Sequence, residues 1–77
     1  MKSTPLGNFR RGRGLRLVDV AKRMGTSHAE VSRFETSGKG TDEFRLRWSR
    51  AVGTSPAKAT ALQEETQSAD PARRGAA

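Results

Sequence analysis

The chain has 77 residues, no cysteine and one histidine, and its 15 lysines and arginines outnumber eight acidic residues for a net charge of +7. This length allows one small domain with a modest core, so a deep catalytic cleft is not expected. Without cysteine the chain forms neither disulfides nor thiolate metal sites, and one histidine does not hold zinc alone. No segment has the length of a membrane span or the pattern of a signal peptide, which favours a cytoplasmic protein.

The basic charge is concentrated toward the N-terminal side. Residues 1–58 hold 13 basic and five acidic residues, whereas residues 59–77 hold two basic and three acidic residues. A strongly basic folded region is typical of a domain that binds a polyanion such as nucleic acid. A merely solubilising surface is the alternative interpretation.

The first expected elements are a flexible arm over residues 1–4 and a helix over residues 5–13. Thr4 followed by Pro5 is a helix-start signal, because the hydroxyl caps the helix and proline fits its first turn. Leu6 and Phe9 are the apolar anchors of this helix, and Gly14 is expected to end it.

Two helices, over residues 17–24 and 28–35, are expected on either side of a turn at Gly25. Apolar residues recur there at spacings of three and four, the period of a helix with one buried face; these residues are Leu17, Val20, Ala21, Met24, Val31 and Phe34. Glycine accepts the positive φ that ends a helix, and Ser27 caps the next one, with Glu30 placed to complete a capping box. The pattern predicts a helix-turn-helix, whose second helix enters the DNA major groove.

A loop and two more helices complete the expected all-α bundle of five short helices. The loop ends near Asp42, and the helix over residues 42–52 carries Phe44, Trp48, Ala51 and Val52 on one face, with Leu46 off that face. Ser55 and Pro56 begin a helix over residues 56–67. We therefore expect a domain over residues 5–67 and a disordered tail over residues 68–77.

The sequence resembles the lambdoid phage repressor and Cro family of helix-turn-helix proteins over about residues 5–62. The residues that carry the resemblance are Arg10, Gly14-Leu15, Ala21, Gly25, Ser27, Val31, Glu35, Phe44, Ala51 and Gly53-Thr54-Ser55. It implies a transcriptional regulator, expected to be a repressor, that binds a palindromic operator in double-stranded DNA as a homodimer. It also implies an ion pair between Arg10 and Glu35. The dimer surface that it implies includes Val52, Pro56, Ala57 and Leu62.

The outward side of the helix over residues 28–35 is expected to read bases. Its candidates are His28, Ala29, Ser32 and Arg33, of which Arg33 suits guanine and Ala29 suits the thymine methyl group. Phosphate contacts are expected from the surrounding cations and one hydroxyl, namely Ser27, Arg10, Arg11, Arg13, Arg16 and Lys39. Arg45, Arg47 and Arg50 are further candidates, although helix geometry spreads them around the axis. Arg16 and Leu17 stand where the family often has a polar cap followed by glutamine.

Other functions remain open at this point. Antitoxin-type and restriction-controller autoregulators share the module and would add a protein partner. A non-specific nucleic-acid binder is another alternative, although the aromatic residues all have the pattern of core residues and leave no stacking platform. No cofactor, metal site or enzyme activity is expected, because no catalytic or metal-binding set of residues can be assembled.

Overall fold

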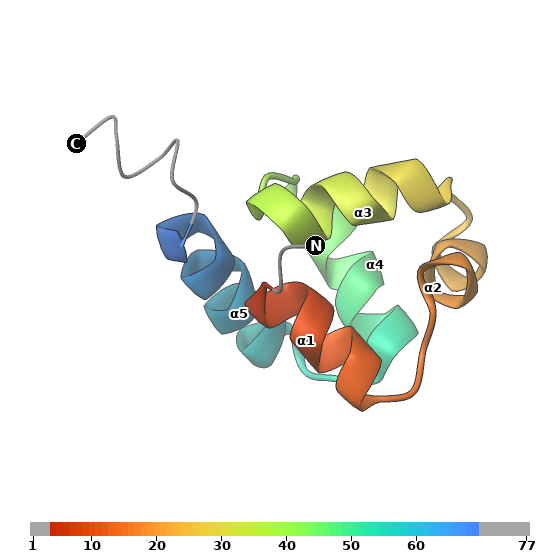
Figure 1. Cartoon of the computed structure of the whole chain (residues 1–77), viewed down its shortest axis with the longest axis horizontal. Helices are drawn as coiled ribbons and strands as arrows, with labels where there is room; N and C mark the ends of the chain where they lie inside the picture. Colours follow the sequence, from red (N-terminus) through yellow and green to blue (C-terminus); the bar gives the residue numbers. More distant parts are fainter. Residues whose placement is uncertain (1–3, 70–77) are drawn as a thin grey trace.

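Five helices and no strand form over residues 4–69, the part of the chain that the computed structural model describes (Figure 1). The helices are α1 (Pro5–Gly12), α2 (Leu17–Met24), α3 (His28–Ser37), α4 (Asp42–Val52) and α5 (Pro56–Ala69). The expected all-α bundle is confirmed. Helix α1 ends one residue earlier than expected, whereas α3 and α5 each extend two residues further.

The predicted ends of the domain shift slightly. Thr4 belongs to the folded part, because its hydroxyl accepts a hydrogen bond from the Gly7 N–H at 3.1 Å and donates to the Glu35 carbonyl at 2.6 Å. Ser68 and Ala69 belong to α5 and not to the expected tail. The remainder of the predicted arm and tail, residues 1–3 and 70–77, lies outside the described residues.

Side-chain caps begin most of the helices. Helices α1, α3, α4 and α5 are each capped by a hydroxyl oxygen that accepts a hydrogen bond from a backbone N–H three residues further on. These hydroxyl groups belong to Thr4, Ser27, Thr41 and Ser55 respectively. The expected capping box at α3 is wrong in one detail, because the Glu30 carboxylate accepts from the Thr26 hydroxyl and not from the backbone of Ser27. At α2 the Asp19 carboxylate accepts the Arg16 N–H at 2.9 Å.

Gly25 makes the short connection between α2 and α3. Its φ of +71° lies in the left-handed region, which residues with a Cβ atom rarely adopt. The turn ends α2 and lets α3 begin at His28, so α3 crosses the bundle next to α2 (Figure 1).

The core is built around the ring of Trp48, which is fully buried. The Phe34 ring lies 5.9 Å from it and 5.1 Å from the Phe44 ring, and the Phe9 ring lies 6.3 Å from Trp48 on the other side. Aliphatic side chains from all five helices close around these rings, including Leu6, Val20, Val31, Val52 and Leu62. Helix α4 packs against both α2 and α5, which places Trp48 at the centre.

One buried ion pair ties three helices together. Arg10 Nε lies 2.8 and 2.9 Å from the two carboxylate oxygens of Glu35, and the Trp48 indole N–H donates to the same carboxylate at 3.0 Å. Arg10 also donates to the Leu15 carbonyl at 2.8 Å. The ion pair that the family resemblance implies is therefore formed.

The same burial corrects two expectations. Arg10 is 6% exposed and its guanidinium is held by Glu35 and the Leu15 carbonyl, so it presents almost no surface to a phosphate group. Val52 and Leu62 are 2% and 5% exposed and belong to the core, so they do not form a dimer surface. Pro56 and Ala57 are exposed. Within residues 4–69, no helix is both long and apolar enough to cross a membrane.

Candidate nucleic-acid interface

Helix α3 presents a row of side chains outward. His28, Ala29 and Arg33 are exposed and Ser32 is half-buried, whereas Val31 faces the core. This division follows from the helical period of 3.6 residues, which turns every third or fourth residue inward. All four predicted base-reading residues therefore lie on the outer side of α3, which we call the α3 ridge.

Two hollows flank this ridge. The first, which we call the α1/α3 groove, has a volume of about 330 Å³ and lies among α1, the start of α2 and α3. It is lined by Thr4, Gly7, Arg10, Arg11, Leu17, Ser32, Glu35 and Thr36. The second, the loop pocket, has a volume of about 320 Å³ and lies between α3 and the α3–α4 loop. Ser32 thus faces one hollow and Arg33 the other.

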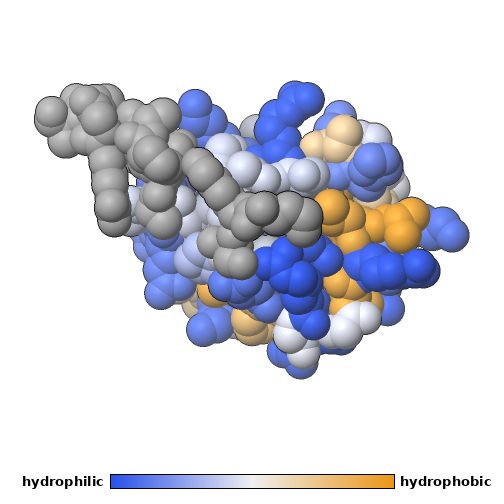
Figure 2. Space-filling model, viewed as in Figure 1, coloured by the Kyte–Doolittle hydropathy of each residue, from blue (hydrophilic) through white to orange (hydrophobic). Residues whose placement is uncertain are grey.

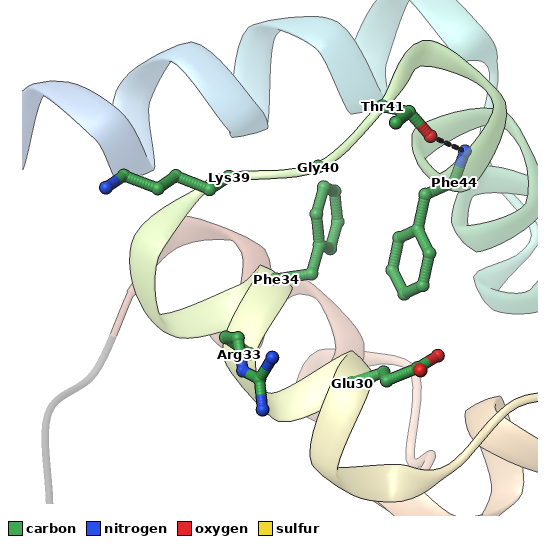
Figure 3. A pocket seen from close by; sticks show the side chains of 7 residues that line it. All are labelled: Glu30, Arg33, Phe34, Lys39, Gly40, Thr41 and Phe44. Carbon is green, nitrogen blue, oxygen red and sulfur yellow. Dashed lines mark hydrogen bonds between the residues drawn. The ribbon is translucent and has the colours of Figure 1, made fainter.

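The loop pocket has aromatic side chains inside and charged groups at its edge (Figure 3). The rings of Phe34 and Phe44 face each other across it, and Gly40 passes over the Phe34 ring. Arg33 extends from α3, and Lys39 extends from the loop away from the rings (Figure 3). Neither cation has a partner among the described residues, so both remain available to an anion.

Two glutamines of α5 hold the α3–α4 loop in place. The side-chain amides of Gln63 and Gln67 donate to the Gly38 carbonyl at 2.9 and 2.8 Å, and Gln63 also donates to the Gly40 carbonyl at 3.3 Å. Gly38 has a φ of +74°, and a Cβ there would lie 2.7 Å from Gln67 Cγ, so the clamp requires glycine. The loop that carries Lys39 is therefore fixed to the bundle on its inner side.

The remaining predicted phosphate residues fall in different places. Arg11 lines the α1/α3 groove and donates to the Asn8 side chain at 2.7 Å. Ser27 and Arg16 are exposed at the starts of α3 and α2. Arg13 is not brought to the α3 ridge, because it donates to the Gly53 carbonyl at 3.1 Å and its guanidinium lies 5.1 Å from the Phe9 ring.

Asp19 and Arg16 form an ion pair at the start of α2. The pKa of Asp19 lies below its ordinary value, chiefly because its carboxylate accepts the backbone N–H of Arg16 and also because it accepts from the Arg16 guanidinium. The ion pair is exposed, with Arg16 Nε 3.3 Å from the carboxylate. The charge of Arg16 is thus partly neutralised.

The α3 ridge is polar apart from the methyl group of Ala29, whereas the larger apolar side chains are exposed elsewhere. Figure 2 shows apolar residues toward the right of the molecule, the side on which Figure 1 places α2. Helix α2 carries Val18, which is 42% exposed. Leu17 at the start of the same helix lines the α1/α3 groove, so that groove has one apolar wall.

The structure adds residues that the sequence did not indicate. Thr36 is exposed in the last turns of α3 and lines the α1/α3 groove, but the predicted helix ended one residue before it. Gln63 and Gln67 lie on a helix whose apolar pattern is weak, and no sequence signal pairs them with a glycine carbonyl. The Trp48 contact to Glu35 had a signal, because a buried indole N–H requires an acceptor.

No protein-family model, curated protein or solved structure matches this chain.

Proposed function

We propose that the protein is a sequence-specific DNA-binding regulator that places α3 in the major groove. The observation that carries the proposal is the α3 ridge, whose side chains at His28 and Arg33 have no partner among the described residues. Cationic groups stand on both sides of it, at Arg11 and Lys39. A protruding polar helix with flanking cations has the arrangement that a major groove and its two phosphate backbones require.

The expected base contacts follow from the side chains on the ridge. The Arg33 guanidinium can donate two parallel hydrogen bonds to guanine O6 and N7. His28 can donate to guanine, Ala29 offers a methyl group to thymine, and Ser32 can bond to either base type. Because only two of these four side chains discriminate strongly, DNA shape is expected to contribute to specificity.

Phosphate contacts supply most of the affinity in this proposal. Arg11 and Arg16 contact phosphates of one DNA strand. Lys39, Ser27 and the free backbone N–H groups at the start of α3 contact the other phosphates around the ridge. The glutamine clamp holds the Lys39 loop in position, which lowers the entropy lost on binding.

One chain reads few base pairs, so we propose a homodimer that assembles on a palindromic operator and represses by occupying it. The exposed start of α5, at Pro56 and Ala57, is the dimer contact that remains after Val52 and Leu62 are assigned to the core. Such a contact is small, so the dimer is weak without DNA.

Selection of duplexes from a random pool in the presence of competitor DNA, followed by binding in rising salt, tests the proposal. We expect one palindromic sequence to survive competition and the affinity to fall steeply with salt. Equal binding to all sequences would instead indicate a non-specific nucleic-acid binder, and no binding at low salt would contradict both.

A further inference from the structure

A third hollow lies away from the α3 ridge, between the C-terminal halves of α2 and α4. It has a volume of about 330 Å³ and is lined by Arg23, Met24, Arg47, Arg50 and Ala51. We propose that this arginine hollow binds the phosphate groups of a second nucleic-acid segment, so that one chain contacts two duplexes. This inference rests on the proposed function for its first duplex.

The three guanidinium groups of the hollow differ in how they are held. Arg23 donates from α2 to the Ala51 carbonyl at the end of α4, at 2.7 Å, which fixes its side chain across the hollow. Arg47 donates to the Glu43 carboxylate at 2.8 Å. The Arg50 guanidinium has no hydrogen-bond or ion-pair partner among residues 4–69.

The three guanidinium groups keep N–H donors without acceptors and positive charge without a matching carboxylate among the described residues. A guanidinium group has five N–H donors, so the single bonds of Arg23 and Arg47 leave most of theirs available. Three guanidinium groups line one hollow and Glu43 neutralises only Arg47, so the hollow carries a net positive charge that favours an anion. The fork of N–H groups on arginine matches the oxygens of a phosphate group.

The lining favours phosphate over a protein partner. Protein interfaces depend on aromatic and other large anchors that enter pockets. The apolar lining residues here, Met24 and Ala51, are 7% and 5% exposed, and the exposed large apolar residues of the described chain, Val18 and Leu46, do not line the hollow. The accessible surface of the hollow is therefore provided mainly by guanidinium groups.

The arginine hollow is separate from the α3 ridge. No residue of α3 lines it. Arg23 is six residues along α2 from Leu17 of the α1/α3 groove, and Arg50 is six residues along α4 from Phe44 of the loop pocket, each a displacement of about 9 Å along a helix. None of the residues that line the arginine hollow lines either hollow beside the ridge, so we assign it to a second segment.

A bridging assay with Arg50→Gln tests the inference. A duplex is fixed to beads, the full-length protein is added, and capture of a second, labelled duplex is measured beside the affinity for a single duplex. Arg50 is the best position because its replacement releases no partner, and circular dichroism checks the fold. We expect Arg50→Gln to lower capture several-fold and to leave single-duplex affinity unchanged.

Lys58→Gln is the matched control, because it removes one exposed charge from α5, outside all three hollows. We expect it to leave capture unchanged. If Arg50→Gln also leaves capture unchanged, any bridging comes from the dimer and the inference is wrong. If Arg50→Gln weakens single-duplex binding as much as capture, the hollow belongs to the first DNA contact and the inference is again wrong.

Arginine Nε–Hε signals in NMR spectra keep the two proposals distinguishable. If no duplex binds to the protein, the proposed function fails, and inorganic pyrophosphate becomes the probe of the hollow. Shifts at Arg23, Arg47 and Arg50 with pyrophosphate would support a phosphate site, and their absence would overturn it. Shifts caused by poly-glutamate and not by duplex DNA would assign the hollow to an acidic protein and overturn the inference.

Discussion

The two halves of α3 differ in how the rest of the protein holds them. In the C-terminal half, Phe34 and Glu35 are 2% and 4% exposed, and α1, α4 and α5 all donate hydrogen bonds to Glu35 or Gly38. In the N-terminal half, His28 and Ala29 are exposed and Val31 alone is buried. The helix is thus anchored at one end and presented at the other.

This difference separates stability from recognition. Substitutions in the anchored half are expected to change the free energy of unfolding, because they leave buried polar groups without partners. Substitutions in the presented half are expected to change binding and to leave stability nearly unchanged. The first three predictions below test this comparison, and the last one tests the start of α2.

Glu35→Ala is expected to have the largest effect. It removes the carboxylate from Arg10 and from the Trp48 indole, and breaking a buried ion pair by removing one partner costs about 3–5 kcal/mol. Unfolding by urea, followed by circular dichroism, measures the loss. The control is Glu43→Ala, which breaks the exposed pair with Arg47 and should cost at most about 1 kcal/mol. Equal losses of unfolding free energy in the two variants would show that the buried ion pair does not anchor α3 more strongly than an exposed pair.

Arg33→Ala tests recognition by the α3 ridge, because Arg33 is exposed although it lies at the start of the anchored half. We expect DNA binding to weaken by about 1–3 kcal/mol with specificity relaxed at one base position, because the guanine contact is lost. The free energy of unfolding should change by no more than about 0.5 kcal/mol. Binding to a panel of single-base variants of the selected site measures both effects. A uniform loss over the panel would place Arg33 on a phosphate.

Gln67→Ala tests the glutamine clamp at the C-terminal end of α3, next to the anchored half. It removes one of the donors to the Gly38 carbonyl, which should cost about 1 kcal/mol of stability. Hydrogen exchange of the backbone amides over residues 38–41 should become faster. Glu64→Ala is the control, since Glu64 is an exposed neighbour on α5 that makes none of these bonds. Unchanged exchange in Gln67→Ala would mean that Gln63 alone holds the loop.

Helix starts and the all-α class follow from local signals in the sequence. Hydroxyl caps, Pro5 and Pro56, and the apolar period act within a few residues, so a single sequence contains the information. The ion pair between Arg10 and Glu35 followed from the family resemblance, yet Arg10 was also expected at a phosphate. The structure favours the ion pair, because Arg10 is only 6% exposed and its side chain is held by Glu35.

The parts that sequence analysis missed depend on contacts between distant residues. The amides of Gln63 and Gln67 reach a carbonyl more than 20 residues away, and nothing in their local pattern distinguishes them from exposed glutamines. Arg13 and Arg11 look equivalent in sequence, but α1 turns Arg13 toward Gly53 and Arg11 toward the α1/α3 groove. The direction in which a side chain points at the end of a short helix depends on the tertiary structure, so it could not be predicted from the sequence.

Asp19→Asn tests the start of α2 and is expected to have the smallest effect. The pKa of Asp19 is lowered in the folded protein by its hydrogen bonds from Arg16, so the charged carboxylate stabilises the fold above the unfolded-state pKa. That contribution is lost as pH falls through the folded-state pKa, below the ordinary value near 3.8. The wild type should therefore be slightly more stable than Asp19→Asn at neutral pH, and the gap should close in acid. Comparing the two proteins by urea unfolding at each pH isolates Asp19, because the two proteins differ in no other carboxyl group. A gap that persists at low pH would mean that the asparagine loses geometry and not charge.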